Sequence, residues 1–200
     1  MHEINLEIMA CEAFFNFLGK YIPVSELLKR RIVEVSGVKV YSAREIIQEP
    51  GTYCKYFRYV VKGGIRYYTN FDGREITTWF EFENYLAIPF DSFFMQKLGF
   101  EYMQALEETH MLEISYDDYQ QLYDDFPEMD RFGRLWLEQE SAFQVDFFKY
   151  FNYLTAAQRY SRLLEYEPRI EQKVKLTHIA SFLGIAPETL SRVRSNFIKG

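Results

Sequence analysis

Cysteine is scarce in this sequence. The 200 residues include only Cys11 and Cys54, which lie far apart in the chain. Two thiols cannot build a disulfide framework, and this pair lacks the close spacing of a metal knuckle or a redox pair. Because disulfides are rare in the reducing cytosol, the composition indicates a cytoplasmic protein.

Long hydrophobic runs are also missing. No stretch approaches the roughly 18–20 apolar residues that a membrane span needs, because charged residues interrupt every run. The first residues, MHEINLEIMA, carry acids early and lack a basic start followed by an apolar core. That pattern predicts neither a signal peptide nor a membrane partner.

Residues typical of metal-binding and catalytic sites are few as well. His110 is the one histidine in the β-rich region described below, whereas metal-dependent enzymes on a β-barrel use two or three histidines plus a carboxylate. No Ser-His-Asp arrangement is evident, and Gly63-Gly64 is not followed by the Lys-Ser/Thr of a phosphate loop. Carboxylate pairs such as Asp117-Asp118 are typical of a solvated helix face. We therefore expect no catalysis, no bound metal and no cofactor.

The sequence is rich in aromatic residues, and its charge is distributed unevenly. The 16 tyrosines, 19 phenylalanines and 2 tryptophans make up 18% of the chain, which excludes disorder over most of its length. Residues 155–200 hold eight bases and four acids, a net charge of +4, which leaves −10 for the remainder of the total of −6. A polyanion such as DNA would be repelled by the body and accepted by the tail.

The hydrophobic period changes along the chain. Residues up to about 35 have a helical period, with Gly19 as a stop and Ser25 as the cap of a second helix. From Val38 to about Ser115 the period is two, and Asp72-Gly73 is a hairpin signal. The short runs with this period are VKVYSAREII, YFRYVV, GIRYYTNF, REITTWFEF, YLAIPF, FEYMQALE and MLEIS. Such spacing favours an antiparallel sandwich or a jelly-roll barrel.

A long helical pattern follows Pro127, from Glu128 to about Asn152. Large apolar residues fall on or near one heptad seam, namely Met129, Phe132, Trp136, Phe143 and Tyr150. Such a helix packs well against a symmetric copy of itself. Its outward faces carry further apolar residues, namely Leu135, Leu137, Val145, Phe147 and Phe148. We expect a homodimer, with a helix that lies across its own barrel as the alternative. The predicted domains are residues 1–127, 128–153 and 154–200.

Residues Leu176–Phe197 have the pattern of a helix-turn-helix. Such a motif needs a small residue in the first helix, a glycine at the turn and buried apolar residues at fixed offsets. Ala180 and Gly184 meet the first two needs. The apolar offsets are filled by Ile179, Leu183, Ile185, Leu190 and Val193. Thr177 can cap the first helix, and Pro187 suits the first turn of the second.

The second helix of this motif presents Glu188 and Arg192 four residues apart, and therefore on one face. In a major groove a carboxylate can accept from cytosine and a guanidinium can bind guanine. The alternative is an ordinary exposed Glu–Arg pair. We expect the two side chains to read bases because they lie in the only basic part of the chain. Candidates for phosphate or secondary contacts are Lys175, Thr177, His178, Thr189, Ser191 and Arg194, although a lone His178 can equally be a partly buried helix residue.

The segment GIAPETLSRVR resembles the recognition helix of the Crp/Fnr family of bacterial transcription regulators, whose usual pattern is Gly-x-Ser-Arg-Glu-Thr-x-(Gly/Ser)-Arg. Glu188, Thr189 and Arg192 match its Glu, Thr and final Arg, and in the family that Glu and that Arg read base edges. Pro187 stands where a first base-reading Arg is usual, and Ala186 replaces the Ser, so the preferred half-site can differ from the common one.

The resemblance extends over nearly the whole chain. KYFRYVVKGGIRYYTNFDGREI is similar to the strand–Gly–strand region of the family's cyclic-nucleotide-binding barrel, and Glu128–Tyr153 sits where the family places its dimer helix. The resemblance implies an α+β fold with an N-terminal antiparallel β jelly-roll barrel, a long dimerisation helix and a C-terminal helix-turn-helix. It also implies a cytoplasmic homodimer that binds a pseudo-palindromic site in double-stranded DNA, with the two recognition helices about 34 Å apart.

Three features depart from the family pattern. Members that bind cyclic AMP carry a Gly-Glu and an Arg-Ser pair, whereas YLAIPFDSFFMQKLGFEYMQALE offers only Lys97 as a cation, so we expect no tight binding of cyclic AMP. Cys11 and Cys54 are too few for an iron–sulfur cluster held by four thiolates of one chain. The sequence stops at Gly200 without the usual β-hairpin wing, which predicts a lower non-specific affinity for DNA.

The sequence does not identify the signal that the β-rich region would sense. Its aromatics favour a small apolar ligand if a pocket exists; otherwise the region holds the dimer together or contacts RNA polymerase. The alternative function is a ligand-binding β-barrel whose helical tail mediates protein contacts only.

Overall fold

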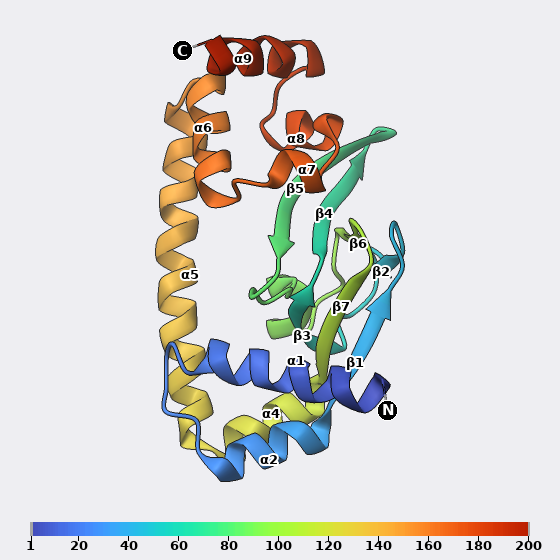
Figure 1. The fold of residues 1–200 in the computed structure, drawn as a ribbon, viewed down its shortest axis with the longest axis vertical. Coiled ribbons are helices and arrows are strands. Elements are labelled where there is room, and N and C mark those ends of the chain that lie inside the picture. The colour runs from blue at the N-terminus through green and yellow to red at the C-terminus, as the bar shows by residue number, and fades with distance from the viewer. Residues whose placement is uncertain (1, 200) are drawn as a thin grey trace. The chain divides into compact units, whose positions relative to one another are not determined.

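The computed structural model describes the backbone of residues 2–199 and the side chains of residues 5–196. The helices in the described residues are α1 (His2–Leu18), α2 (Glu26–Val35), α3 (Phe90–Phe94), α4 (Tyr116–Asp125), α5 (Pro127–Tyr153), α6 (Ala156–Tyr166), α7 (Ile170–Lys173), α8 (Leu176–Phe182) and α9 (Pro187–Lys199) (Figure 1). The strands are β1 (Ser36–Tyr41), β2 (Ile46–Gln48), β3 (Tyr56–Lys62), β4 (Gly64–Phe71), β5 (Arg74–Phe82), β6 (Tyr102–Ala105) and β7 (Thr109–Ser115).

The chain forms two compact units. The first comprises Met1–Arg66 with Phe80–Gln139, and the second comprises Tyr67–Trp79 with Glu140–Gly200. The hairpin of β4 and β5 and the long helix α5 each contribute to both units. The end of the hairpin, Tyr67–Trp79, therefore belongs to the same unit as the C-terminal helices.

The strands form two separate sheets. One has the order β1-β7-β3 and the other the order β2-β6-β4-β5. The pairs β1–β7, β3–β7 and β2–β6 are antiparallel, as predicted. The predicted closed barrel is wrong, because among the described residues the two sheets are not joined by strand pairing. The run YLAIPF is not a strand either, since it pairs only through a single bridge between Leu86 and Tyr59.

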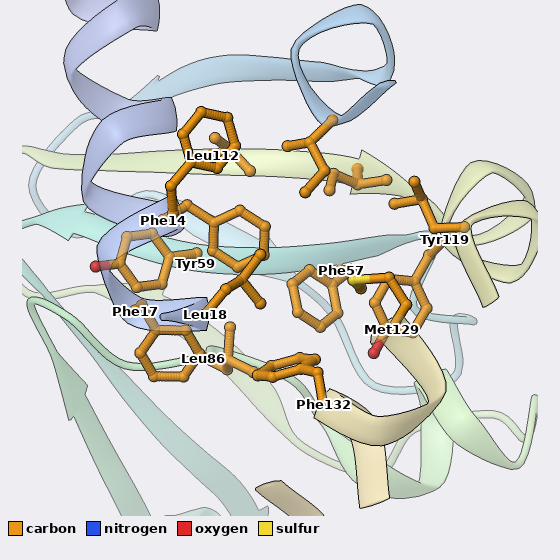
Figure 2. Close-up of a cluster of buried hydrophobic side chains, with 14 of the residues drawn as sticks. Phe14, Phe17, Leu18, Phe57, Tyr59, Leu86, Leu112, Tyr119, Met129 and Phe132 are labelled. Carbon is orange, nitrogen blue, oxygen red and sulfur yellow. The ribbon is translucent and has the colours of Figure 1, made fainter. Parts of the chain in front are cut away.

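The main core of the first unit lies between helices and a sheet. Phe14 of α1 packs against Phe57 and Tyr59 of β3, with ring centroids 5.9 and 5.3 Å apart. The side chains drawn in Figure 2 also come from β7, α4 and the start of α5. Apolar residues on one face of β3 thus bury the helical stripe predicted for the first residues.

Local signals set the ends of several helices as predicted. Ser25 caps α2 by accepting a hydrogen bond from the Leu28 N–H at 3.2 Å. Helix α1 ends just before Gly19, and α5 begins at Pro127. Thr155 and Gln158 form a capping box at the start of α6, which was not among the predictions. These signals act within one turn of helix, which is why the sequence alone locates them.

The first half of the predicted dimer seam is buried in its own chain, which corrects the prediction. Met129 and Phe132 are fully buried and Trp136 is 4% exposed, all within the core of the first unit. Phe132 meets Tyr21 edge to face at 5.5 Å, and Trp136 stacks on Phe90 of α3 at 5.6 Å. No apolar surface of these three residues is left for a second copy.

The second unit has an aromatic cluster around Trp79, at the end of the hairpin segment. Its ring lies 5.6 Å from that of Phe143 and 4.9 Å from that of Phe147, both on α5. It also lies 5.8 Å from the ring of Tyr166 on α6 and 5.7 Å from that of Phe182 on α8. One indole therefore holds three helices together. The predicted turn at Asp72-Gly73 is confirmed, with positive φ angles of 51° and 76°.

The second half of the predicted seam also has partners within the chain. Phe143 packs on Trp79, and the Tyr150 ring lies 4.8 Å from the Arg162 guanidinium. Phe143 and Tyr150 remain 36% and 40% exposed, and on another face of α5 Val145 is 54% exposed and Phe148 is 71% exposed. The monomer therefore buries the first half of the predicted seam, while Val145 and Phe148 are more exposed than the two residues of its second half.

Among the described residues, no helix is both long enough and apolar enough to span a membrane.

Candidate nucleic-acid interface

Helices α8 and α9 are joined by a tight turn at Gly184. Its φ of +65° is a left-handed conformation that glycine adopts without strain. The Gly184 N–H donates to the Ser181 carbonyl at 3.1 Å, and the Ile185 N–H donates to the Ala180 carbonyl at 3.0 Å. These bonds form a Schellman end to α8. Pro187 then begins α9, at the position where a missing N–H costs nothing.

One face of each of these helices is buried. Ile179 and Ala180 of α8, Leu183 of the turn and Leu190 of α9 are each no more than 1% exposed. Helix α9 packs against both α8 and α6. The predicted small residue, Ala180, is buried, and its carbonyl accepts a hydrogen bond from the Ile185 N–H at the turn. The apolar offsets of the predicted motif therefore bury the angle between the helices.

The opposite face of α9 is open to solvent. Glu188, Ser191 and Arg192 are exposed, and Thr189 is half-buried. The Arg192 Nε donates to the backbone carbonyl of Glu188 at 3.4 Å. Among the described side chains, Glu188 and Arg192 do not form the ion pair that was the alternative to base reading. Both functional groups are therefore available to an external partner.

The other predicted contact residues differ in their exposure. Lys175 and Thr177 are exposed at the start of α8, and His178 is half-buried. Lys175 is the N-cap of α8 and no side chain caps that helix, so the predicted capping role of Thr177 is wrong. The Thr177 hydroxyl lies in the first turn instead, next to Lys175. Contacts of these residues with phosphate stay predictions.

Arg194 has a partner within the chain. Its Nη2 donates to the Glu171 Oε2 at 3.0 Å and its Nε donates to the Glu171 Oε1, so both edges of the carboxylate are used. The Tyr160 hydroxyl donates to the same Oε1. The three side chains come from α9, α7 and α6. Glu171 and Tyr160 are absent from the sequence prediction, because no periodic pattern joins residues so far apart.

The titration of these groups follows from their contacts. Burial raises the pKa of the Glu171 carboxyl, but hydrogen bonds from Arg194 and Tyr160 outweigh it and hold that pKa below its usual value. The hydrogen bond with Glu171 raises the pKa of Arg194. Burial and the bond to Glu171 raise the pKa of Tyr160 to about 12. At neutral pH the cluster holds one anion, one cation and one neutral phenol.

Internal ion pairs determine how much positive charge the basic segment offers. Three of its acids are paired: Glu165 with Arg162, Glu167 with Arg169, and Glu171 with Arg194. Three of its eight bases are therefore neutralised within the chain. Lys175 and Arg192 are exposed and lie on the two helices of the motif. The open face of α9 itself carries one exposed cation, Arg192, and one exposed anion, Glu188.

The hairpin segment contacts α8 directly. The Ser181 hydroxyl accepts from the Thr77 N–H at 3.0 Å and donates to the Glu75 carbonyl at 3.2 Å. Ser181, which follows the buried Ala180, thus links α8 to the hairpin segment. In the part of the chain that the structure describes, no group of three His, Cys, Asp or Glu side chains is placed to hold a metal ion.

No protein-family model and no curated protein sequence matches the chain. Solved structures do. A chain of the Crp/Fnr family of transcriptional regulators from Eubacterium rectale has a TM-score of 0.68 and 21% identity, over 90% of this chain and 89% of that one. FixK2 from Bradyrhizobium japonicum has a TM-score of 0.68 and 18% identity, over 82% and 85%. The c-di-GMP-responsive global regulator CLP of Xanthomonas campestris has a TM-score of 0.65 and 17% identity, over 85% and 90%.

At these identities the likeness establishes the fold. The chain has the fold of Crp/Fnr regulators, with an N-terminal β-rich region and a long helix. The resemblance predicted from the sequence is confirmed at that level.

Proposed function

We propose that this protein is a transcription regulator of Crp/Fnr type, which binds a specific DNA sequence as a homodimer and is not an enzyme. In this proposal α8 and α9 are a helix-turn-helix and α9 enters the major groove. Glu188 and Arg192 read base edges there. Lys175, Thr177, His178, Thr189 and Ser191 contact phosphates or support these contacts.

One observation carries the proposal. The turn at Gly184 buries one face of α9 and leaves the functional groups of Glu188 and Arg192 unpaired with each other on the other face. An exposed pair of opposite charges four residues apart on a helix would ordinarily join. Their separation suits a surface that binds a partner with both donors and acceptors. The shared fold with proteins described as transcriptional regulators supports the same interpretation.

The dimer contact that we propose uses the open stripe of α5, not the predicted one. Ser141, Val145, Phe148 and Asn152 are exposed and follow each other at steps of four, three and four residues. That spacing places them on one seam of a coiled coil. Two copies joined along this seam would present two α9 helices to a pseudo-palindromic site.

The effector of this regulator is not cyclic AMP in our proposal. A phosphate held away from water needs a guanidinium or a set of backbone N–H donors. Lys97, the cation in the corresponding segment, is exposed. The β-rich region would respond to another signal, of which a small apolar ligand fits the many aromatic side chains best, or would contact RNA polymerase.

Selection of bound duplexes from a random pool, followed by titration of the selected site, tests the proposal. We expect a two-fold symmetric site. Arg192→Ala should weaken binding by roughly 1–3 kcal/mol and relax the preference at one base pair of each half-site. Binding should weaken steeply with salt, because phosphate contacts release counterions.

Two results would refute the proposal. One is a pool that yields no enriched sequence at low salt. The other is an Arg192→Ala variant that binds the selected site as tightly, and with the same base preference, as the unaltered protein.

A further inference from the structure

The recognition helix is held at its far end by the ion cluster of Glu171, Arg194 and Tyr160. We infer that Arg194 is a positioning residue that fixes α9 through Glu171 and Tyr160, and not a phosphate contact. The inference rests on the proposed function, because it concerns how α9 meets DNA. It replaces the phosphate role that the sequence suggested for Arg194.

The geometry of the cluster supports a fixed orientation. Two donors of one planar guanidinium meet both oxygens of one carboxylate, which defines the position of the arginine more closely than a single contact would. The Tyr160 hydroxyl fixes the carboxylate from a third side, and Tyr160 is only 3% exposed. Because Tyr160 belongs to the core of α6, the cluster ties α9 to a rigid element.

The cluster is more shielded from water than neighbouring ion pairs. The Arg194 and Glu171 side chains are 30% and 28% exposed, whereas Arg162 and Glu165 are 54% and 58% exposed. Exposed pairs contribute little to structure, because solvent screens them. A half-buried bidentate pair with a third hydrogen bond is a stronger restraint.

The same contacts leave Arg194 poorly suited to bind phosphate. A phosphate would have to compete with a carboxylate that already holds two donors of the guanidinium. The paired charges of Arg194 and Glu171 cancel, so the pair would release no counterion from DNA. Arg194 lies two positions from Arg192 on α9, and any tilt of the helix at this point moves the base-reading side chain.

Variants that remove a charge of the pair, compared with one that keeps it, separate positioning from phosphate contact. The affinity of the selected duplex would be measured across a range of salt for Arg194→Gln, Arg194→Lys and Glu171→Gln. If Arg194 positions α9, each variant should bind roughly threefold to tenfold more weakly, and the salt slope of Arg194→Lys, which keeps the charge of the pair, should be unchanged. Arg194→Lys should not restore the affinity, because an ammonium group lacks the planar, two-pronged geometry of the guanidinium. Discrimination at the base pair read by Arg192 should also fall, which a role in overall stability alone would not cause.

A phosphate contact would give the opposite pattern. Arg194→Gln would reduce the salt slope by about 0.9, Arg194→Lys would retain it, and Glu171→Gln would tighten binding by freeing the guanidinium and removing a negative charge. That set of results would overturn the inference. Lys175→Gln is the matched control, because it removes one charge at a predicted phosphate contact and should reduce the slope.

Hydrogen exchange of the α9 amides in the DNA-free protein distinguishes this inference from the proposed function. Arg194→Gln and Glu171→Gln should each speed exchange in α9, while Arg162→Gln, which breaks an exposed pair on α6, should not. If the protein binds no DNA but these rates change, the cluster still holds α9 and the proposed function alone fails. If the rates do not change, the inference is wrong whatever the DNA result.

Discussion

At the scale of single residues, the least expected feature is an ion pair inside the first unit. Arg58 of β3 lies directly opposite Glu113 of β7 in the sheet, and the Arg58 Nε donates to the Glu113 Oε1 at 2.7 Å. Their side chains are 6% and 10% exposed. The Tyr41 hydroxyl donates to the same oxygen at 2.6 Å, and burial together with this bond raises the pKa of Tyr41. The Arg58 Nη1 also donates to the Cys54 sulfur at 3.3 Å.

Neutralising this carboxylate should be costly, because Arg58 would keep a buried charge without a counterion. We expect Glu113→Gln to lower the free energy of unfolding by about 3–5 kcal/mol, measured by urea denaturation at neutral pH. Glu108→Gln is the matched control. Glu108 pairs with Lys62 at 3.1 Å, but both side chains are more than 60% exposed, so its loss should change stability by no more than about 0.5 kcal/mol. Equal effects of the two substitutions would contradict this account.

At the scale of elements, the hairpin of β4 and β5 contributes more to the helical unit than its turn signal suggests. Its end segment, Tyr67–Trp79, belongs to the second unit. There the Trp79 indole packs on α5, α6 and α8, and the backbone at Thr77 bonds to Ser181. Helix α8 is only seven residues long. A helix that short does not persist without tertiary packing, so we infer that the hairpin stabilises it.

Removing the indole should therefore loosen α8. We expect Trp79→Ala to cost about 2–3 kcal/mol of stability, less than a fully buried tryptophan because Trp79 is half-buried. Hydrogen exchange in α8 should accelerate more than exchange in the sheet of β1, β7 and β3. Phe71→Ala is the control on the same hairpin, because Phe71 is 71% exposed and its loss should leave both rates unchanged. Acceleration spread evenly over the chain would exclude a local role for Trp79.

The elements also separate what could be predicted from the sequence from what could not. Ser25 acts through its side chain, and Asp72-Gly73 and Gly184 act through their backbone conformation, each within one turn, and each was located correctly. The burial of Met129, Phe132 and Trp136 within the monomer was not predicted, because α5 carries two apolar stripes and its period cannot say which one the monomer buries. The run YLAIPF failed for a related reason: its residues Leu86, Ala87 and Ile88 are buried, but burial in a core does not require strand pairing.

Within the candidate site, too, the sequence predicts the faces of single helices but not the contacts between residues far apart in the chain. The faces of α8 and α9 follow from helical spacing, so the open positions of Glu188 and Arg192 were predictable. The partner of Arg194 was not, because Glu171 lies on another helix and the sequence contains three other acids in the same segment. A charged residue on an amphipathic helix can face solvent or a neighbouring helix, and only the packing of α6, α7 and α9 decides between them.

At the scale of the whole molecule, the proposed homodimer can be tested directly by a substitution in the exposed stripe of α5. Phe148 is 71% exposed, so an aspartate there cannot disturb the packing of the monomer. Placed on a coiled-coil seam, it would face its own copy and add like charges to an apolar contact. We expect Phe148→Asp to shift the protein to monomers in analytical ultracentrifugation.

A monomeric variant should then bind the two half-sites of the DNA independently of each other. Affinity for the full pseudo-palindrome should fall by about 10²-fold or more, because the second half-site no longer benefits from a high effective concentration. Affinity for a single half-site should not change, since α9 is untouched. Phe71→Asp is the control, with the same change at a residue of the same 71% exposure. Should both variants stay dimeric, the stripe of Val145 and Phe148 is not the interface, and the two α9 helices must be brought together by another surface.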